Sequence, residues 1–339
     1  MTTQIVNRWA ILAVVALAVL PTHSALIGSG SGVTASPRVT FDADYAESDY
    51  LNAGVASVAP KRTELASAST ESSDEQRRQS AKALIKRFQA MGYELDMIRD
   101  GDAPVPRVFI STLPEDLHAL RQVELKKSVF FKTTLPLILK ENEHIAEDRE
   151  RLLRLVRLIK EGETLSDNES TWLAQLAVRY KTDVDDLNTL LARVDVIPVS
   201  LAMAQSAEES GWGTSRFAQN GNALFGQWTT ADDDGLVPEE RPDGKTHKVK
   251  AFDNLADSVA GYMRNLNTHG AYRSFRAERS QMRARGVDPD GRTLAGELTK
   301  YSARGQKYVD SIRLIIDANG LRSLDDATLF ASDGGEQEV

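Results

Sequence analysis

The stretch PVSLAMAQSAEESGWG, residues 198–213, sets the expectations for the rest of the chain. It predicts a helix, because Pro198 suits a first helical turn and Gly211 suits a helix end. Glu209 then lies in the last turn, where the helix dipole disfavours ionisation and an adjacent Trp212 would exclude water. A carboxyl group with a raised pKa is the general acid that a glycosidase needs. The alternative is an exposed acidic pair before a helix-ending glycine.

Two motifs give this stretch a family resemblance. The segments AQSAEESGWG (residues 204–213) and NGNALFG (residues 220–226) resemble the signature of the N-acetylglucosaminidases of glycoside hydrolase family 73, which include flagellar rod-cap hydrolases and autolysins. From about residue 106 to 324 the chain more closely resembles the Bax proteins of Gram-negative bacteria, which carry this domain behind a secretion signal. The resemblance implies a mainly α, lysozyme-like helical domain with a small β-lobe. It also transfers the family's catalytic acid to Glu209.

A second carboxylate is expected if water must be activated on the opposite face of the sugar. The stretch VPEERPDG, residues 237–244, resembles the region where related enzymes carry a mobile second acid, and Glu240 aligns best by its distance to the following turn. Glu239 is a rival, and an acidic loop without a catalytic role is the alternative. The N-acetyl group of the substrate is a further alternative to a protein nucleophile, so inversion and retention both stay open. Glu208, roughly 100° around the helix from Glu209, is expected at the surface.

Aromatic and amide side chains near the acid are candidates for sugar binding, because the C–H faces of pyranose rings are apolar and their rims form hydrogen bonds. The nearest aromatic residues in sequence are Trp212, Phe225 and Trp228. Phe225 has core packing as its alternative role. Asn222 either binds the acetamido group of the substrate or makes a turn.

A third segment, YSARGQKY at residues 301–308, resembles the family pattern Tyr-Ala-Thr-Asp-Pro-x-Tyr but lacks its Asp-Pro. The resemblance implies that Tyr301 is a cleft residue. Tyr308 falls on the apolar face of the last predicted helix, so it is expected to pack.

Composition excludes several other classes of function. The net charge of −8 and the pI near 5.3 argue against a nucleic-acid partner, which would need a broad basic face. The five histidines have no metal-ligand spacing and cysteine is absent, so we expect no metal, no cofactor, no thiol chemistry and no disulfide. The glycines at 28–32 precede no helix of a nucleotide site. The partner that the resemblance implies is the glycan strand of peptidoglycan.

Residues 1–24 are typical of an export signal. Arg8 supplies positive charge, residues 9–20 form an apolar run, and residues 21–25 offer small residues for cleavage. The run is short for a membrane span. We therefore expect a periplasmic product; the alternative is an uncleaved signal that anchors the protein to the inner membrane.

The rest of the chain divides by composition and periodicity. Residues 25–79 are rich in Ser, Ala, Gly and Thr and are predicted to be a flexible spacer. Residues 80–194 are predicted to form a helical extension, in which Pro136 should bend or start a helix. Residues 195–325 form the predicted lysozyme-like domain, with a small β-lobe, and residues 326–339 the predicted disordered tail.

These observations predict an endo-β-N-acetylglucosaminidase that hydrolyses the β-1,4 bond after N-acetylglucosamine in peptidoglycan. Glu209 is the expected proton donor and Glu240 the expected base or stabiliser. One alternative is a lytic transglycosylase of the same fold, and another is a non-catalytic scaffold that binds the cell wall. The long helical extension favours the scaffold, and it would equally allow regulation of the cleft. The oligomeric state and any protein partner stay open.

Overall fold

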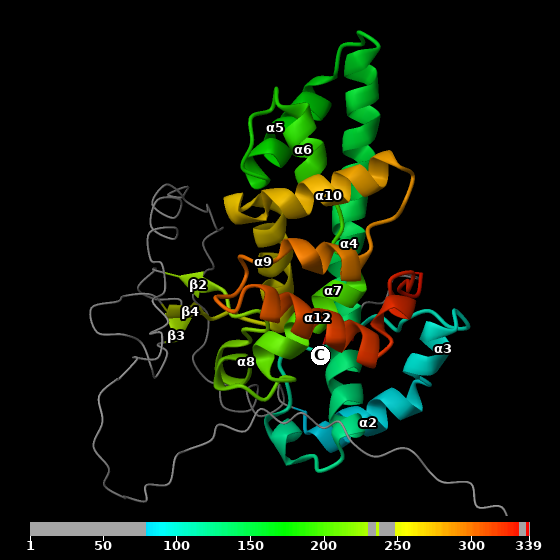
Figure 1. Ribbon diagram of the computed structural model, residues 1–339. Coiled ribbons are helices and arrows are strands. Elements are labelled where there is room, and N and C mark those ends of the chain that lie inside the picture. Colours follow the sequence, from blue (N-terminus) through cyan, green and yellow to red (C-terminus); the bar gives the residue numbers. More distant parts are fainter. Residues whose placement is uncertain (1–78, 230–234, 237–247, 332–336, 339) are drawn as a thin grey trace, which may run out of the picture. The chain divides into compact units, whose positions relative to one another are not determined.

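The computed structural model describes residues 79–229, 235–236, 248–331 and 337–338. The helix predicted from residues 198–213 is α7 (Val199–Ser210), and the other helices surround it (Figure 1). Pro198 is its N-cap, and Gly211 ends it in a left-handed conformation with φ of 57°, which favours glycine. Every residue of α7 except Glu208 and Glu209 is buried. The helix is therefore a core element that exposes only its acidic end.

The first turn of α7 is held by a carboxylate from the far end of the chain. Asp325 accepts hydrogen bonds from the backbone nitrogen of Ser200 at 2.7 Å and from its hydroxyl at 2.8 Å. Burial, followed by the charges of Asp290 and Asp326, raises the pKa of Asp325 to about 6. Asp325 thus does for α7 what a local capping side chain does for most helices.

Helix α4 (Val123–Lys160) is 38 residues long and contains Pro136 in its interior. The prediction that a helix could start at Pro136 is wrong, because one helix runs through that position. Residues 129–139 are all buried, and α4 packs against α7 and α9 (Leu255–Thr268). Tertiary packing therefore outweighs the hydrogen bond that proline removes.

The main hydrophobic core lies between α7 and its neighbours. Its buried members include Leu135 of α4, Met203 of α7, Met263 of α9 and Ile312 of α12 (Gln306–Ala318). The N-terminal helix α2 (Ala81–Ala90) adds Leu84 and Phe88 to the same core. The further helices around this core are α3 (Leu95–Arg99), η2 (Glu115–Ala119), α8 (Arg216–Gly221), η3 (Gly270–Tyr272), α10 (Arg273–Ala284), α11 (Gly291–Leu294), η4 (Ala295–Glu297) and η5 (Leu321–Leu324).

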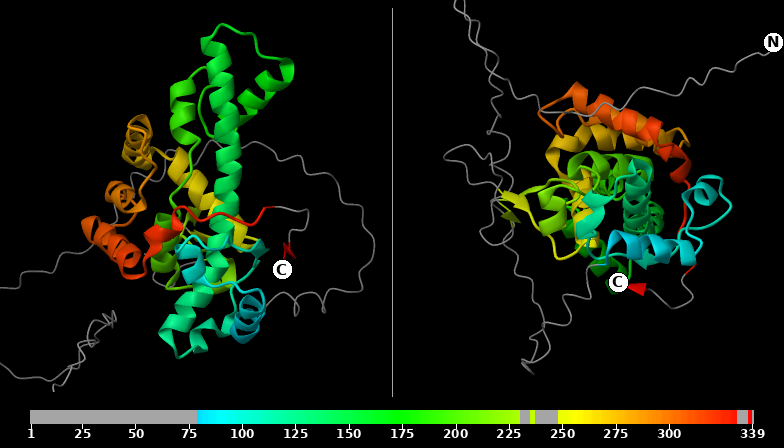
Figure 2. Two further views of the ribbon diagram at one scale, coloured as in Figure 1. Left: turned by 90° about the vertical axis from the view of Figure 1, so that its right-hand side faces the viewer. Right: turned by 90° about the horizontal axis from the view of Figure 1, so that it is seen from below.

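A second, separate hydrophobic cluster lies at the C-terminal half of α4. There α5 (Asp167–Arg179) and α6 (Leu187–Arg193) pack against α4 and bury Leu152, Leu173 and Leu190. We call α5, α6 and this half of α4 the helical arm, and Figures 1 and 2 show it extending from the other helices. The predicted domain boundary between residues 194 and 195 does not separate the two hydrophobic clusters, because the first half of α4 belongs to the main core.

A three-stranded antiparallel sheet confirms the predicted β-lobe. Its strands are β2 (Trp228–Thr229), β3 (Gly235–Leu236) and β4 (Lys248–Lys250), in the order β2–β4–β3. The register pairs Trp228 with Val249 and Gly235 with Lys250. The described part of the chain is thus mainly helical with a small β-lobe, as predicted.

The C-terminal segment returns to the N-terminal part of the described chain. Leu329 is buried and forms a parallel bridge with Val105, and β5 (Gln337–Glu338) pairs with β1 (Val108–Phe109). The segment predicted as a disordered tail therefore includes backbone pairing. The predicted signal and nearly all of the predicted spacer lie outside the described residues. Within those residues, no helix combines the length and apolarity that a membrane span requires.

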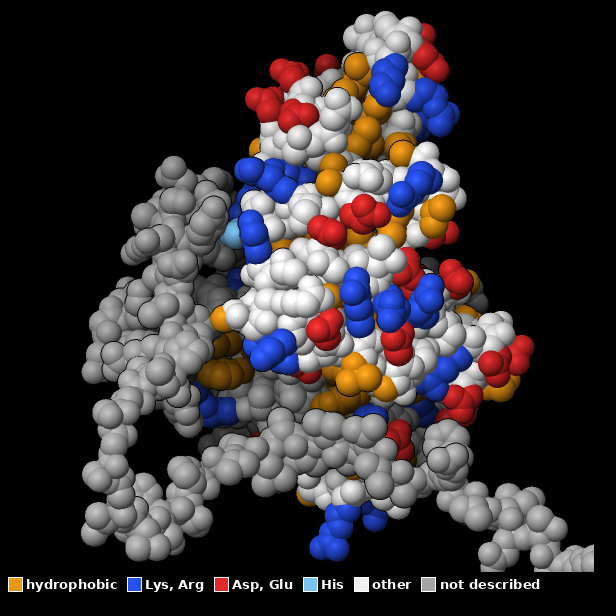
Figure 3. All heavy atoms as spheres, in the orientation of Figure 1, with side chains coloured by type: hydrophobic (Ala, Val, Ile, Leu, Met, Phe, Trp, Pro, Cys, Tyr) orange, Lys and Arg blue, Asp and Glu red, His pale blue; other side chains and the backbone are white. Residues whose placement is uncertain are grey.

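The face drawn in Figure 3 carries basic and acidic side chains in mixed order. Some described pairs are close enough for salt bridges, such as Arg292 with Asp317 at 3.0 Å and Arg322 with Asp290 at 2.8 Å. Exposed pairs of this kind contribute little to stability, at most about 1 kcal/mol each. Neither sign of charge dominates this face.

Candidate active site

Glu209 lies at the C-terminal end of α7, one residue before the last, and its side chain is partly buried. Glu208 points to a different neighbour, since it forms an ion pair with Arg304. The two adjacent carboxylates therefore differ in environment: Glu208 is paired with a cation, whereas Glu209 has no ion-pair partner among the described residues.

Two groups lie directly against the carboxylate of Glu209. The hydroxyl of Tyr308, on α12, lies near enough to lower the pKa of this carboxylate by hydrogen bonding. Gly226 lies on another side, because a Cβ atom at this position would be 3.5 Å from Oε2 of Glu209. The backbone at Gly226 has φ of 60°, so a side chain there would be both strained and close to the acid.

Gln205 organises the hydroxyl groups behind the acid. Its Nε2 donates to the hydroxyl of Tyr308 at 2.8 Å, and its Oε1 accepts from the hydroxyl of Tyr262 at 2.8 Å. Since the Tyr308 oxygen already accepts from Gln205, its hydrogen is available to the carboxylate of Glu209. Gln205 precedes Glu209 by four residues, so both lie on the same face of α7.

Stacked aromatic rings line the same region. The rings of Phe225 and Tyr262 stack with centroids 3.8 Å apart, and those of Tyr301 and Tyr308 stack with centroids 5.4 Å apart. The hydroxyl of Tyr301 donates to the carbonyl oxygen of Phe225 at 3.1 Å. This bond connects the two stacks, so the segment around Gly226 is tied to α12.

Burial raises the pKa of Glu209 to about 7, from an ordinary value of 4.5. The charge of Glu208 raises this pKa further, whereas the hydrogen bond from Tyr308 and the charge of Arg304 lower it. The pKa of Tyr308 is raised as well, first by burial and then by the charge of Glu209. Near neutral pH a substantial fraction of Glu209 therefore keeps its proton, as a general acid requires.

Trp212, a candidate for sugar binding, packs against α4. Its ring packs against Phe131 of α4 with centroids 5.3 Å apart, and Nζ of Lys127 lies 5.2 Å from the centre of the ring. The residue has φ of 59°, which turns the chain after Gly211. The described contacts of this ring are thus with α4, and its role in sugar binding stays a prediction.

Two further candidates are occupied by structural contacts. Nδ2 of Asn222 donates to the carbonyl oxygens of Phe252 at 3.0 Å and Asp253 at 3.2 Å, and φ of 50° makes it the cap of α8. These contacts match the turn that was the alternative for Asn222. Phe225 is 2% exposed and stacked on Tyr262, which leaves little of its ring for a sugar.

The remaining candidates differ in what the structure describes. Tyr301 is partly buried, and its ring stacks on that of Tyr308. Only the side chain of Tyr308 therefore separates Tyr301 from Glu209 along this set of contacts. Trp228 lies in β2, where the structure describes its backbone only. Glu240 and its rival Glu239 both fall in 237–247, outside the described residues.

Sequence reasoning missed the residues that surround Glu209. Gln205 lies inside the motif of residues 204–213 but has no predicted role, although an amide four residues before an acid lies on the same face of a helix. Tyr308 was expected only to pack; it is 1% exposed, yet its hydroxyl also reaches the acid. Tyr262 and Gly226 lie in other segments, and no local pattern connects them with α7.

Comparison with known proteins gives three similarities. The family described as Glucosaminidase (mannosyl-glycoprotein endo-beta-N-acetylglucosaminidase) matches residues 184–321. Protein bax of Escherichia coli (strain K12) is 35% identical over 204 residues, which are 58% of this chain and 71% of that protein. The crystal structure of the catalytic domain of the autolysin Auto from Listeria monocytogenes covers 51% of this chain and 97% of that domain, at 17% identity and a TM-score of 0.30. The glucosaminidase match contains Gln205, Glu209, Gly226, Tyr262 and Tyr308.

Proposed function

The chain belongs to the family of Protein bax and carries a glucosaminidase domain, the domain of a glycoside hydrolase, and we propose that it cleaves peptidoglycan glycan strands with Glu209 as the general acid. The bond that we propose is the β-1,4 linkage after N-acetylglucosamine. The proposed location is the periplasm, because residues 1–24 are typical of an export signal.

The observation that carries the proposal is the environment of Glu209. Burial raises its pKa to about 7, so the carboxyl group can hold a proton at neutral pH and transfer it to the glycosidic oxygen. After the transfer the carboxylate is charged, and the Tyr308 hydroxyl donates a hydrogen bond to it. Burial thus favours the protonated form of Glu209 before the proton transfer, and the Tyr308 hydroxyl favours the ionised form after it.

The second group of the reaction is part of the proposal too. We assign Glu240 as the base or stabiliser, with Glu239 as its rival, because the glycosidase reaction needs a group on the opposite face of the sugar. The acetamido group of the substrate is the alternative. Glu240→Gln and Glu239→Gln distinguish these possibilities. Replacing the catalytic carboxylate should reduce the rate strongly, whereas replacing the other should not.

A lytic transglycosylase is the second candidate function, and one observation favours it. Among the described residues, the other carboxylate that acts on Glu209 is Glu208, which is paired with Arg304. A single acid would suffice if the sugar's own hydroxyl replaced water. The product would then end in an anhydro sugar.

The decisive experiment is mass spectrometry of sacculi digested by the mature protein. Hydrolysis predicts fragments with reducing N-acetylglucosamine ends, whereas a transglycosylase would release anhydro ends. Glu209→Gln should abolish release in either case, because an amide cannot supply the proton. Glu208→Gln is the matched control, and it should keep most of the activity. Undiminished release by Glu209→Gln would refute the proposal.

A further inference from the structure

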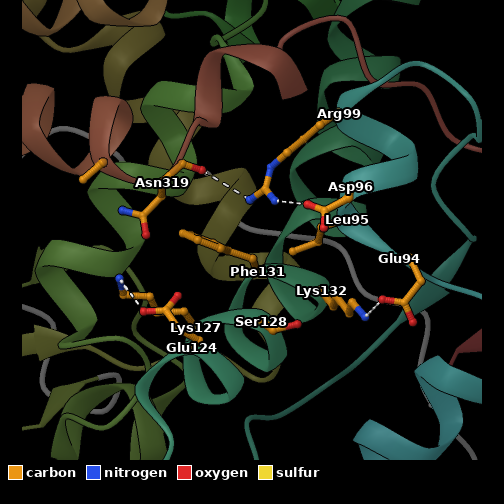
Figure 4. A pocket seen from close by; sticks show the side chains of 11 residues that line it. Glu94, Leu95, Asp96, Arg99, Glu124, Lys127, Ser128, Phe131, Lys132 and Asn319 are labelled. Carbon is orange, nitrogen blue, oxygen red and sulfur yellow. Dashed lines mark hydrogen bonds and ion pairs between the residues drawn. The ribbon is translucent and has the colours of Figure 1, made fainter. Parts of the chain in front are cut away.

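A pocket of about 340 Å³ lies between α3, α4 and the end of α12. Figure 4 shows Arg99 reaching from α3 toward Asn319, with Phe131 of α4 across the middle. Lys127 and Lys132, also of α4, line it as well. Glu209 does not line this pocket, so the pocket is distinct from the candidate active site.

The cations and carboxylates that line the pocket differ in burial. The side chains of Arg99, Lys127 and Lys132 are 26%, 26% and 9% exposed. Each cation pairs with a carboxylate that is far more exposed: 88% for Asp96, 87% for Glu124 and 56% for Glu94. The three cations are therefore more buried than their carboxylate partners; we call the cations the floor of the pocket and the carboxylates its rim.

Such an arrangement suits a ligand with a carboxylate at its inner end and an amine farther out. The i,i+3 pairs of Arg99 with Asp96 and of Lys127 with Glu124 are exposed on the acidic side, so water already competes for them. A ligand carboxylate that reaches the guanidinium of Arg99 can form the strong, directed hydrogen bonds typical of arginine. An amine on the same ligand would then face the carboxylates of the rim.

Two contacts link the pocket with the candidate active site. The Trp212 ring, three residues after Glu209, contacts Phe131 and Lys127 of the pocket wall. Helix α12 carries Tyr308 at the acid and ends at Asn319 in the pocket. At 1.5 Å per residue this length of α12 is about 16 Å. A peptide of about five extended residues spans the same distance.

We propose that this pocket binds the stem peptide of the glycan strand that is being cut. The inference rests on the proposed function, and it specifies the substrate further: strands that still carry peptides with a free carboxylate and a diamino acid. The cationic floor receives the carboxylate, and the anionic rim receives the amine.

The test compares two substrates with the full-length mature enzyme. One is glycan strands with intact stem peptides, and the other is strands from which an amidase has removed the peptides. We expect a lower KM for the peptide-bearing strands. Arg99→Gln should raise that KM by about 10-fold or more, with bare strands cleaved as before, because one charge-assisted hydrogen bond is lost. Lys126→Gln removes a charge from the neighbouring position of α4, which does not line the pocket, and should change neither value.

A second measurement separates the two proposals. The tripeptide L-Ala–γ-D-Glu–meso-diaminopimelate should bind the inactive Glu209→Gln protein in calorimetry, and adding Arg99→Gln should weaken that binding to a similar extent. Equal KM values for both strands, together with no binding of the tripeptide, would overturn the pocket assignment while leaving hydrolysis intact. If neither strand is cleaved, the proposed function fails, and tripeptide binding alone then decides whether the pocket recognises such peptides.

Discussion

The hydroxyl of Tyr308 lowers the pKa of Glu209 by hydrogen bonding, although the two residues are 99 positions apart in the chain. The direction of this hydrogen bond follows from Gln205, whose amide nitrogen donates to the same hydroxyl at 2.8 Å. The bond favours the ionised carboxylate, whereas burial favours the protonated one. The balance between them leaves the pKa near 7, and the following predictions depend on it.

Activity should fall as the pH rises above about 7. A general acid works only when protonated, and the pKa of Glu209 is about 7. The value of kcat/KM for soluble glycan strands should therefore decrease about tenfold for each pH unit on the alkaline side. A profile that stays flat from pH 6 to pH 9 would contradict Glu209 as the acid.

Tyr308→Phe should shift that alkaline limb to higher pH. The variant removes the donor that stabilises the charged carboxylate but keeps the ring that stacks on Tyr301. A shift of about one pH unit corresponds to one charge-assisted hydrogen bond of about 1.4 kcal/mol. Tyr262→Phe is the control, since its hydroxyl contacts Gln205 instead of the acid. An unchanged limb in Tyr308→Phe would disprove the hydrogen-bond direction.

Glu209→Gln should stabilise the fold at alkaline pH. In the folded protein the pKa of Glu209 is about 7, above its ordinary value of 4.5. Its contribution to the free energy of unfolding is therefore fully present below pH 4.5. That contribution is lost as the pH rises through 7, where a partly buried charge must form. The free energy of unfolding of the variant should exceed that of wild type by up to about 3 kcal/mol at pH 8.5. Urea unfolding at pH 4 and pH 8.5 measures this, and an equal difference at both values would contradict it.

Asp325→Ala should destabilise the protein by about 1–3 kcal/mol. The change leaves the backbone nitrogen and hydroxyl of the buried Ser200 without their acceptors. Asp325→Asn keeps an acceptor in the same position, so it should cost much less. Urea unfolding at pH 7 distinguishes the two variants. Equal stability of Asp325→Ala and wild type would show that α7 does not depend on this cap.

The sequence could predict α7 because both of its ends have local causes. Pro198 and Gly211 act within a few residues, and the apolar run between them matches its burial. The small β-lobe was equally predictable from turns and alternation. The course of α4 was not, because Pro136 has a local effect that the packing of residues 129–139 outweighs.

The acid itself was predictable, whereas most of its surroundings were not. Glu209 was found from the helix end and from the family resemblance. Its partner Tyr308 and the second partner of Gln205, Tyr262, lie 103 and 57 residues from Gln205. Periodicity reports which face of a helix is apolar, but it does not report which hydroxyl on that face meets a distant carboxylate.

Helix α4 supplies side chains to both hydrophobic clusters, with Leu135 in one and Leu152 in the other. Each inserted residue rotates the distal half by about 100°, so one extra residue between the clusters would turn the arm's apolar stripe away from α5 and α6. Seven extra residues nearly restore the phase and move the arm outward by about 10 Å. An insertion in this helix therefore keeps the arm's packing only if it adds close to a whole number of turns, such as about 7 or about 11 residues.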